Sequence, residues 1–482
     1  MSRTMEAQDS VEEPSRAAPR VEHFTVEERE SRGKTARGEV PRSVHAVWEP
    51  PSDRRGPVEL LEEQAQTRVQ ELVPLRYGRM LVSPFTFYRG AAYLMASDLS
   101  GLPRTGLLTQ LCGDAHLSNF GGFAAPDRRL LFSINDFDET LPGPFEWDVK
   151  RLVASFEVAG RDRGFDDKRR TSINLEAGRA YRKAMTGFAT EGNFDMWYRR
   201  FDIEELLAQA APMGTSKQVK RAEKNIAKAR TKGSLKAFSK LTELVDGEPR
   251  IISDPPTIEP IEEVAGDAAA SIEGHLRGIM RSYRRTLAGD RRHLLERYRY
   301  VHAARKVVGV GSVGTRAWIM LLLGRDEGDP LFLQFKEAEA SVLEPFLGKS
   351  DFANHGQRVV EGQRLIQAAS DIVLGWTRAD DLEGVTRDFY VRQLWDAKWS
   401  ALVELMEPSA LRYYAKLCGT ELARAHARAG DAIAIASYLG ANDAFERAVA
   451  VFAESYANQN ERDYDALKQA VESGRIKAET DA

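Results

Sequence analysis

The sequence predicts an α+β fold with two lobes, in which a helical lobe is divided between the two ends of the chain and a small antiparallel sheet lobe is inserted between them. Three observations support this prediction. Apolar residues recur at helical spacing through most of the chain before residue 300 and after residue 395, short apolar runs punctuated by glycine fill the interval, and two polar clusters directly follow strand-like runs near residues 114 and 136.

Four segments follow from these patterns. Residues 1–56 are rich in Glu, Arg, Ser and Pro, so we expect an extended or disordered N-terminal arm. Residues 57–300 form a helical lobe with the catalytic and metal-binding loops, residues 301–394 form the small β lobe, and residues 395–482 form helices that complete the helical lobe. Within them we expect strands at 107–111, 130–134, 331–335, 372–376 and 389–394, and helices at 147–158, 166–190, 196–209, 261–300, 355–369 and 410–428.

The composition narrows the class of protein. With 482 residues, 43% of them hydrophobic and 29% charged, the chain is long enough for a two-lobed enzyme with its site between the lobes. The 68 basic and 72 acidic residues nearly cancel, so we expect neither nucleic acid nor a membrane as partner. Two cysteines are too few for a disulfide framework or a zinc cage, and the first ten residues show no signal-peptide pattern, which indicates the cytoplasm.

Two basic stretches each leave two interpretations open. The run from Arg76 to Ala92 combines Arg79 and Arg89 with aromatic residues, as in a buried aromatic cluster around an arginine or in a phosphate clamp. The segment 216–240 carries many Lys and Arg residues against a single Glu223, as in a solvated helical surface or a docking face for an acidic partner.

Polar residues suited to phosphoryl transfer follow the first two predicted strands. Asp114 and Asn119 lie five residues apart just after the first strand, and Asp136 and Asp138 follow the second. Phosphoryl transfer needs a carboxylate that accepts the proton of the attacking hydroxyl, and oxygen ligands that hold magnesium on the phosphates. Such ligands suit Mg²⁺ rather than zinc. We therefore predict Asp114 as the base, Asn119 and Asp136 as Mg²⁺ ligands, and Asp138 as a ligand of a second ion.

The wider motif resembles a known family. The pattern Gly113-Asp-x-His-x-x-Asn119, followed by Ile134-x-Asp-Phe and Gly143-Pro-Phe-Glu-Trp-Asp148, resembles the catalytic signature of aminoglycoside phosphotransferases and protein kinases. This resemblance implies that Asp148 is a buried aspartate that steadies the catalytic loop, with His116 also supporting it. More closely, residues 75–155 resemble a bacterial family known as domain of unknown function 2252. That resemblance extends over most of the chain beyond residue 40 and implies no established substrate.

Two other interpretations apply to the same motif. Acidic turns also end the strands of ordinary sheets. The sequence Gly-Asp-x-His also opens two-metal phosphoesterase sites, in which His116 would be a metal ligand. Those sites need further His and Asn ligands, and none of the eight histidines stands in a Gly-Asn-His cluster.

A glycine-rich loop indicates a nucleotide site in the second lobe. Gly309, Gly311 and Gly314 form the pattern G-x-G-x-x-G. A dinucleotide-binding fold needs a helix directly after the last glycine, but here about nine residues precede a turn cluster at 324–330 and another strand. Strand, glycine loop, strand, turn and strand is the arrangement of a kinase small lobe. We therefore expect the loop, with Ser312, to cover the phosphates of ATP.

The residues after this loop complete the predicted nucleotide site. Lys336 ends the third strand, where a kinase places the lysine that reaches the nucleotide phosphates. We expect Glu361, on the following helix, to hold Lys336, with Glu344 as the second choice. The backbone of Arg392, Gln393 and Leu394 would then meet the adenine.

The order of the two halves is the reverse of the usual kinase order, because Asp114 precedes Gly314 by about two hundred residues. A chain whose termini lie close together can be cut elsewhere and rejoined without losing its contacts. We therefore predict a kinase-like fold with permuted lobe order, in which the helix 410–428 ends beside the catalytic loop.

The function predicted from these residues is ATP- and Mg²⁺-dependent phosphoryl transfer to an unidentified hydroxyl acceptor, either a small molecule or a protein. Two alternatives remain: transfer of AMP from a nucleotide bound in flipped orientation, and nucleotide binding by a regulator that performs no catalysis. A mere binder has no need of Asp114, which favours an enzyme.

Overall fold

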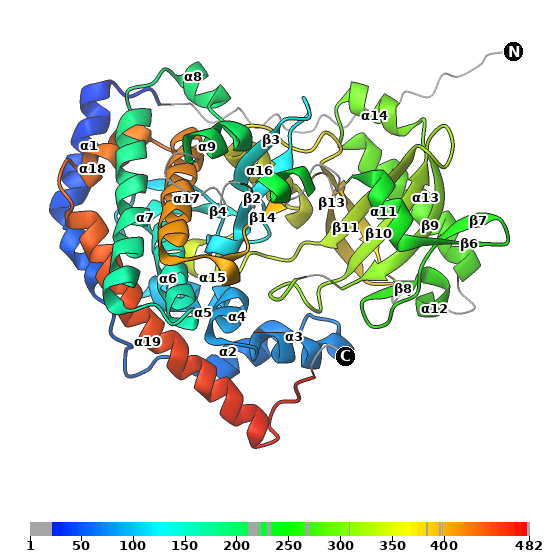
Figure 1. The fold of residues 1–482 in the computed structure, drawn as a ribbon, viewed down its shortest axis with the longest axis horizontal. Coiled ribbons are helices and arrows are strands. Elements are labelled where there is room, and N and C mark those ends of the chain that lie inside the picture. Colours follow the sequence, from blue (N-terminus) through cyan, green and yellow to red (C-terminus); the bar gives the residue numbers. More distant parts are fainter. Residues whose placement is uncertain are drawn as a thin grey trace, which may run out of the picture.

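Figure 1 shows the computed structural model of the chain, with most helices on one side and the largest sheet on the other. The structure describes residues 22–210, 220, 223–228, 233–265, 269–307, 309–381, 384–394, 397 and 399–479. Over these residues the fold is mixed α+β with several small antiparallel sheets, as the sequence predicted at this level of detail. Within the described ranges, no helix is both long and apolar enough to cross a membrane.

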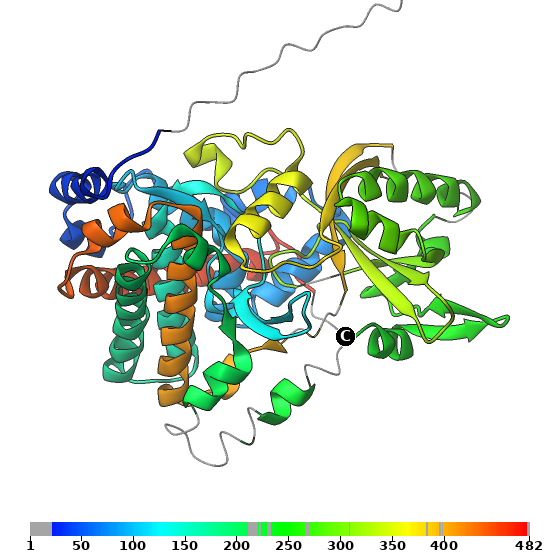
Figure 2. The same cartoon turned by 90° about the horizontal axis from the view of Figure 1, so that it is seen from above.

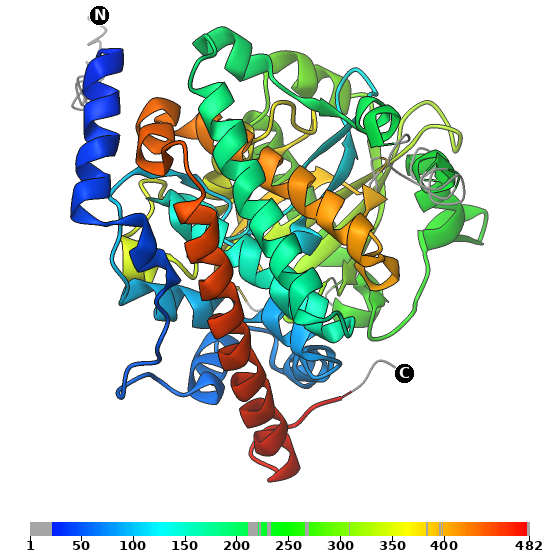
Figure 3. The ribbon, with the colours of Figure 1, turned by 60° about the vertical axis from the view of Figure 1, so that its left-hand side comes forward.

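The helical part is built from segments at both ends of the sequence. In Figure 3, α7, α17 and α19 lie together, although about two hundred residues separate α7 from α17. Helix α6 lies against α7 and α19 and is buried along almost its whole length, so it forms the centre of the main hydrophobic core. The helices of this part are α1 (Val26–Glu39), α2 (Pro57–Ala65), α3 (Val73–Met80), α4 (Pro84–Gly90), α5 (Ala92–Ser100), α6 (Phe145–Asp162), α7 (Asp167–Phe188), α8 (Asn193–Tyr198), α9 (Ile203–Ala210), α17 (Pro408–Ala429), α18 (Ala432–Leu439) and α19 (Ala444–Glu472).

The N-terminal arm contains structure that the sequence did not predict. Residues 26–39 form α1, and residues 42–46 form a short 3-10 helix, so the prediction of an extended or disordered arm is wrong for this part. Thr25 and Glu28 close a capping box at the start of α1. Gly33 lets α1 approach α18 closely, because a Cβ atom there would lie 2.1 Å from the carbonyl oxygen of Ala434. Tertiary contact therefore orders this segment.

The largest sheet has six antiparallel strands in the order β12-β13-β11-β10-β9-β8. Helix α13 (Ala269–Arg285) packs against one face and α11 (Ser234–Leu241) against the other. Residues 234–265 and 269–300 therefore belong with the sheet, and the predicted boundary at residue 300 is too late. The strands are β8 (Ile258–Pro260), β9 (Arg299–Lys306), β10 (Ala317–Leu323), β11 (Pro330–Glu337), β12 (Gly375–Asp380) and β13 (Thr386–Gln393), with α12 (Ile261–Ala265), α14 (Gly289–Leu295) and the hairpin β6 (Thr242–Val245) and β7 (Glu248–Ile251) in the same region. Between β11 and β12 in the chain, α15 (Glu344–Leu347) packs against α5 and β4 (Leu141–Pro144), and α16 (His355–Ile366) packs against β12, β13 and α17.

Several local predictions shift in the structure. The predicted helix 196–209 is divided into two short helices, α8 and α9. Between them, Phe201–Asp202 forms β5, which pairs with β3 and interrupts the helical run. The predicted strand 372–376 begins only at Gly375 and continues to Asp380. The basic segment 216–240 lies partly outside the described residues, and its last part forms α11.

Two small sheets hold the polar loops near residues 114 and 136. Strand β1 (Leu108–Leu111) pairs with β4 (Leu141–Pro144), and β2 (Phe120–Ala124) lies between β3 (Leu130–Ile134) and β14 (Trp399–Ser400). Figure 2 shows the segment that contains α15 and α16 lying between the helical part and the largest sheet. The loops after β1 and β3 thus face the strands of the sheet part.

Helix α17 ends beside the start of the polar loop, as predicted for the helix 410–428. At its end, a Cβ atom on Gly430 would lie 2.8 Å from the Cβ atom of Thr109 in β1. The Thr109 hydroxyl donates a hydrogen bond of 3.2 Å to the carbonyl oxygen of His426. The C-terminal half therefore supplies the helix that leads to a loop from the N-terminal half.

Candidate active site

A cavity of about 660 Å³ opens where the helical part meets the sheet. Its wall combines Asp114, His116 and Asn119 from the first polar loop with Asp136 and Asp138 from the second, and Gly309, Gly311 and Ser312 from the glycine loop. The fold therefore brings two sequence clusters about two hundred residues apart to one space.

The loop after β1 is fixed by a buried carboxylate, as the resemblance implied. Asp148, in the first turn of α6, accepts hydrogen bonds from the backbone N–H groups of Cys112 at 2.8 Å and Gly113 at 3.1 Å. Its Oδ2 atom also lies 3.3 Å from Nε2 of His426. Asn119 closes the loop from the other end, because its side-chain amide donates to the carbonyl oxygen of Asp114 at 2.8 Å.

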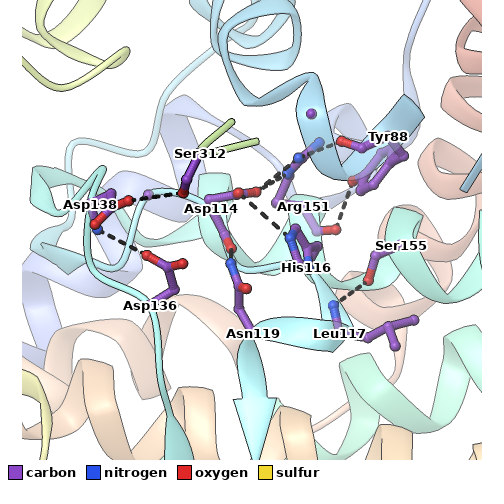
Figure 4. A network of polar contacts seen from close by, with 12 residues as sticks. Tyr88, Asp114, His116, Leu117, Asn119, Asp136, Asp138, Arg151, Ser155 and Ser312 are labelled. Atoms are coloured by element: carbon purple, nitrogen blue, oxygen red, sulfur yellow. Dashed lines mark hydrogen bonds and ion pairs between the residues drawn. The ribbon is translucent and has the colours of Figure 1, made fainter. Parts of the chain in front are cut away.

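Arg151 is the partner of Asp114, and the sequence did not single it out. Figure 4 shows the guanidinium beside the Asp114 carboxylate, and its Nε and Nη2 atoms both lie 2.8 Å from Oδ1. The same guanidinium bonds the carbonyl oxygen of Tyr88 and lies 4.0 Å from the centre of the Tyr88 ring. The sequence did contain a pattern that could have identified Arg151. It follows Asp148 by three residues, which places both side chains on the same face of α6.

Burial and charge act against each other at Asp114. Burial raises the pKa of the Asp114 carboxyl group, while Arg151 and Arg89 lower it, and the net direction is upward. His116, whose Nε2 atom lies 3.6 Å from Asp114, has its pKa held well below the ordinary value by burial and by the same arginines. The Nδ1 atom of His116 is buried and has no hydrogen-bond partner among the described residues. The neutral imidazole of His116 therefore lies beside the Asp114 carboxyl group.

The second polar loop pairs with Lys336 through Asp138. The Lys336 ammonium bonds the Asp138 carboxylate and also donates to Ser312 Oγ at 2.8 Å. Tyr390 donates to the other Asp138 oxygen at 2.9 Å. Although burial lowers the pKa of Lys336, Asp138 outweighs it and raises the pKa above the ordinary value. Lys336 is 3% exposed and lies just behind the cavity wall.

The predicted pairing of Glu361 with Lys336 is absent from the described contacts. Glu361 bonds Arg364 at 3.1 Å on the same helix. The part of α16 that meets the second loop carries Arg358, which donates to the carbonyl oxygens of Asp138 and Thr140. Glu344, the second choice, lies 3.7 Å from His355 and lines the cavity. Asp138 takes the role expected of these glutamates because its loop reaches Lys336 directly.

The glycine loop connects two strands, as predicted, and does not open a helix. Gly309 and Gly314 both have positive φ, of 71° and 88°, which favours glycine there. The loop is held from the helical part: the Arg68 guanidinium donates to the carbonyl oxygen of Val313 at 2.6 Å, and Arg79 donates to that of Gly309 at 2.7 Å. The loop therefore has a fixed position over the cavity.

Two backbone N–H groups of the segment expected to meet the adenine, those of Gln393 and Leu394, bond other parts of the protein. The N–H of Gln393 bonds the Asp371 carboxylate at 2.5 Å, and the N–H of Leu394 bonds the carbonyl oxygen of Phe332 at 2.9 Å. These two donors are thus occupied by the protein. The Arg392 side chain bonds Gln334 at 3.1 Å, and its charge acts on Asp136 and Asp138.

The donor set fits a magnesium ion shared with phosphates. Burial and the neighbouring Asp138 carboxylate raise the pKa of Asp136, so a cation at this position would relieve the repulsion between two buried carboxylates. Asn119 uses its NH₂ group on the backbone, which leaves its oxygen as a ligand. No cluster of three or more His, Cys, Asp or Glu side chains suited to a metal occurs in the described part, so phosphate and water oxygens would complete the shell.

Comparison with known proteins identifies the family. The model of the family described as "Uncharacterized protein conserved in bacteria (DUF2252)" matches residues 68–470. No curated protein and no solved structure matches the chain. The matched range contains both polar loops, the glycine loop and Lys336. The chain therefore belongs to the bacterial DUF2252 family.

Proposed function

We propose that this protein is a kinase-like phosphotransferase that uses ATP and Mg²⁺ to phosphorylate a hydroxyl group. One observation supports this function above the others: Asp114, Asn119, Asp136 and the glycine loop line one cavity, with Lys336 directly behind it. A dinucleotide-binding or phosphoesterase site has no use for this combination.

The sheet gives further support for the kinase-like arrangement. Strands β9, β10 and β11 follow one another in the sheet, with the glycine loop between the first two, and β13 and β12 continue it. Helix α16 lies between β11 and β12 in the chain, as the helix of a kinase small lobe does.

Each residue has a defined task in the transfer. The bond between the γ-phosphorus and the oxygen leading to the β-phosphate breaks, a bond to the acceptor oxygen forms, and the acceptor proton passes to Asp114. Arg151 holds the Asp114 carboxylate in place. Ser312 and the loop N–H groups face the phosphates, and Lys336 neutralises their charge. Bound Mg²⁺, held by Asn119 and Asp136, supplies further neutralisation of the phosphate oxygens.

The test uses ATP labelled on either the γ- or the α-phosphate, with a panel of sugars, small alcohols, aminoglycosides and protein substrates. We expect γ label on an acceptor, dependent on Mg²⁺ and lost in Asp114→Asn. Asp127→Asn is the matched control, because Asp127 lies on an exposed turn and pairs with Arg200. Transfer of the α label would instead identify an AMP transferase, and tight ATP binding without transfer of either label would identify a regulator.

A further inference from the structure

Arg89, the penultimate residue of α4, lines the cavity beside Asp114 and His116. Its Nε atom is buried without a hydrogen-bond partner, and no hydrogen bond or ion pair joins its side chain to another described residue. A guanidinium offers five donors and stays charged, so a half-buried one without partners is costly unless a ligand meets it.

The neighbouring groups do not satisfy this charge. The Asp114 carboxylate is engaged by Arg151, and Asp136 accepts a hydrogen bond from the backbone N–H of Asp138 at 3.2 Å. Burial lowers the pKa of Arg89, and the carboxylates of Asp114, Glu404 and Asp136 offset this only in part. The buried Arg76 bonds the carbonyl oxygen of Gly90, the residue after Arg89, at 3.1 Å. The Arg89 guanidinium therefore has no hydrogen-bond or ion-pair partner among the described residues, although carboxylates lie nearby.

The Arg89 backbone borders the glycine loop, because a Cβ atom on Gly311 would lie 3.3 Å from the Arg89 carbonyl oxygen, but the Arg89 charge acts on Asp114 and His116. The charges acting on Arg89 come first from Asp114, whereas those acting on Lys336 come first from Asp138, and Asp136 acts on both. The Arg89 side chain therefore shares the cavity with Asp114, the proposed base, and does not bond Lys336 or Asp138. The acceptor hydroxyl must lie beside that base.

We propose that Arg89 binds an oxyanion on the acceptor, so that the substrate is a hydroxyl compound that also carries a carboxylate or a phosphate. This inference rests on the proposed function, because the base defines the acceptor side. Arginine suits such recognition, since its planar fork can donate two hydrogen bonds to one carboxylate or phosphate. Arg89 is thus a specificity-determining residue, and neutral alcohols are poorer acceptors.

The first experiment measures binding without turnover. The enzyme is saturated with Mg²⁺ and the non-hydrolysable β,γ-imido analogue of ATP, and inorganic phosphate is titrated by calorimetry. We expect phosphate to bind, with at least a tenfold loss of affinity in Arg89→Met and a smaller loss in Arg89→Lys. Arg104→Met is the matched control, because Arg104 is exposed and bonds the carbonyl oxygens of Ser100 and Phe346 outside the cavity. Equal analogue affinity in all variants would show that they are folded.

The second experiment compares acceptors in matched sets: glycerol with glycerate and glycerol 3-phosphate, and glucose with gluconate and glucose 6-phosphate. We expect γ-phosphoryl transfer to prefer anionic members at least tenfold in kcat/KM, and Arg89→Met to remove the preference mainly by raising KM. Whether glycerate or glycerol 3-phosphate is preferred distinguishes a carboxylate from a phosphate as the recognised group.

The outcomes separate this inference from the proposed function. No phosphate binding to the wild-type protein, or equal binding to Arg89→Met, overturns the anion site even if neutral acceptors are phosphorylated. Arg89-dependent phosphate binding without any transfer of γ label leaves the anion site standing and refutes the phosphotransferase.

Discussion

The substitution Asp148→Asn tests how the loop after β1 is held. The Asp148 carboxylate accepts two backbone N–H bonds, from Cys112 and Gly113, and interacts with His426. An asparagine keeps one acceptor oxygen, so one buried N–H loses its partner at a cost of about 1–3 kcal/mol, and the other bond loses about 1 kcal/mol because its acceptor is no longer charged. We therefore expect the loop to open more easily by roughly 3 kcal/mol.

The two cysteines offer a direct assay. Cys112 lies in the loop, Cys418 lies in α17, and both thiols are buried. If the loop closes again faster than the thiol reacts, a decrease of about 3 kcal/mol in the free energy of opening speeds the labelling of Cys112 roughly 100-fold. Labelling is followed by mass spectrometry of the two cysteine-containing peptides, with Cys418 as the internal control. An unchanged Cys112 rate, or equal acceleration of both cysteines, would refute the assignment of Asp148 as a local support.

Three further predictions concern the site and the N-terminal segment. Asp114→Asn should abolish transfer and keep Mg²⁺-dependent ATP binding, whereas Asp136→Asn should lose both in calorimetry; equal loss of binding in the two variants contradicts the roles of base and ligand. Arg151→Met should move the acid limb of the kcat/KM profile to higher pH, because removing the cation raises the pKa of Asp114, and an unmoved limb argues against Asp114 as the base. Burial lowers the pKa of His45 to about 3, so the folded protein binds fewer protons than the unfolded chain below pH 6.5. Denaturant unfolding should therefore show the free energy of unfolding falling by about 2 kcal/mol from pH 6.5 to pH 5. If the dependence of this free energy on pH is the same in His45→Gln, His45 is not its cause.

The geometry of His45 gives that pH effect a structural cause. Its Nε2 atom lies 2.7 Å from the hydroxyl of Tyr438, which in turn donates to the carbonyl oxygen of Val40 at 2.9 Å. The Nδ1 atom is buried without a partner. Protonation would place an unpaired N–H and a charge there, next to the positive charge of Lys150.

The sequence predicted elements whose signals are local. The glycine pattern between two apolar runs predicted the loop between β9 and β10, because a strand, and not a long helix, follows it. Asp114 and Asp136 were singled out because each comes just after a strand, and Asn119 because it lies five residues after Asp114. The role of Asp148 came from the resemblance and was matched by its two backbone hydrogen bonds.

The N-terminal helix α1 could not be found in this way. It has little amphipathic pattern, and its buried residues are Gly33 and Ala36, which are too small to mark an apolar face. Its contact with α18 joins residues about four hundred positions apart, and the arginine side chains of Arg37 and Arg42 bond carbonyl oxygens at 437 and 439. Such packing of small residues depends on the shape of the partner, which no local window of sequence contains.

The sequence by itself indicated many of the polar groups that line the cavity, because residue type and spacing after strands are local properties, but it did not indicate Arg151. Only the tertiary structure decided how their charges pair: Lys336 with Asp138, Asp114 with Arg151, and Glu361 with Arg364. Ion pairing depends on distance through space and on burial, and several nearby carboxylates compete for each cation. The same reason explains Arg89, whose lack of a partner becomes visible only when every neighbouring carboxylate has been placed.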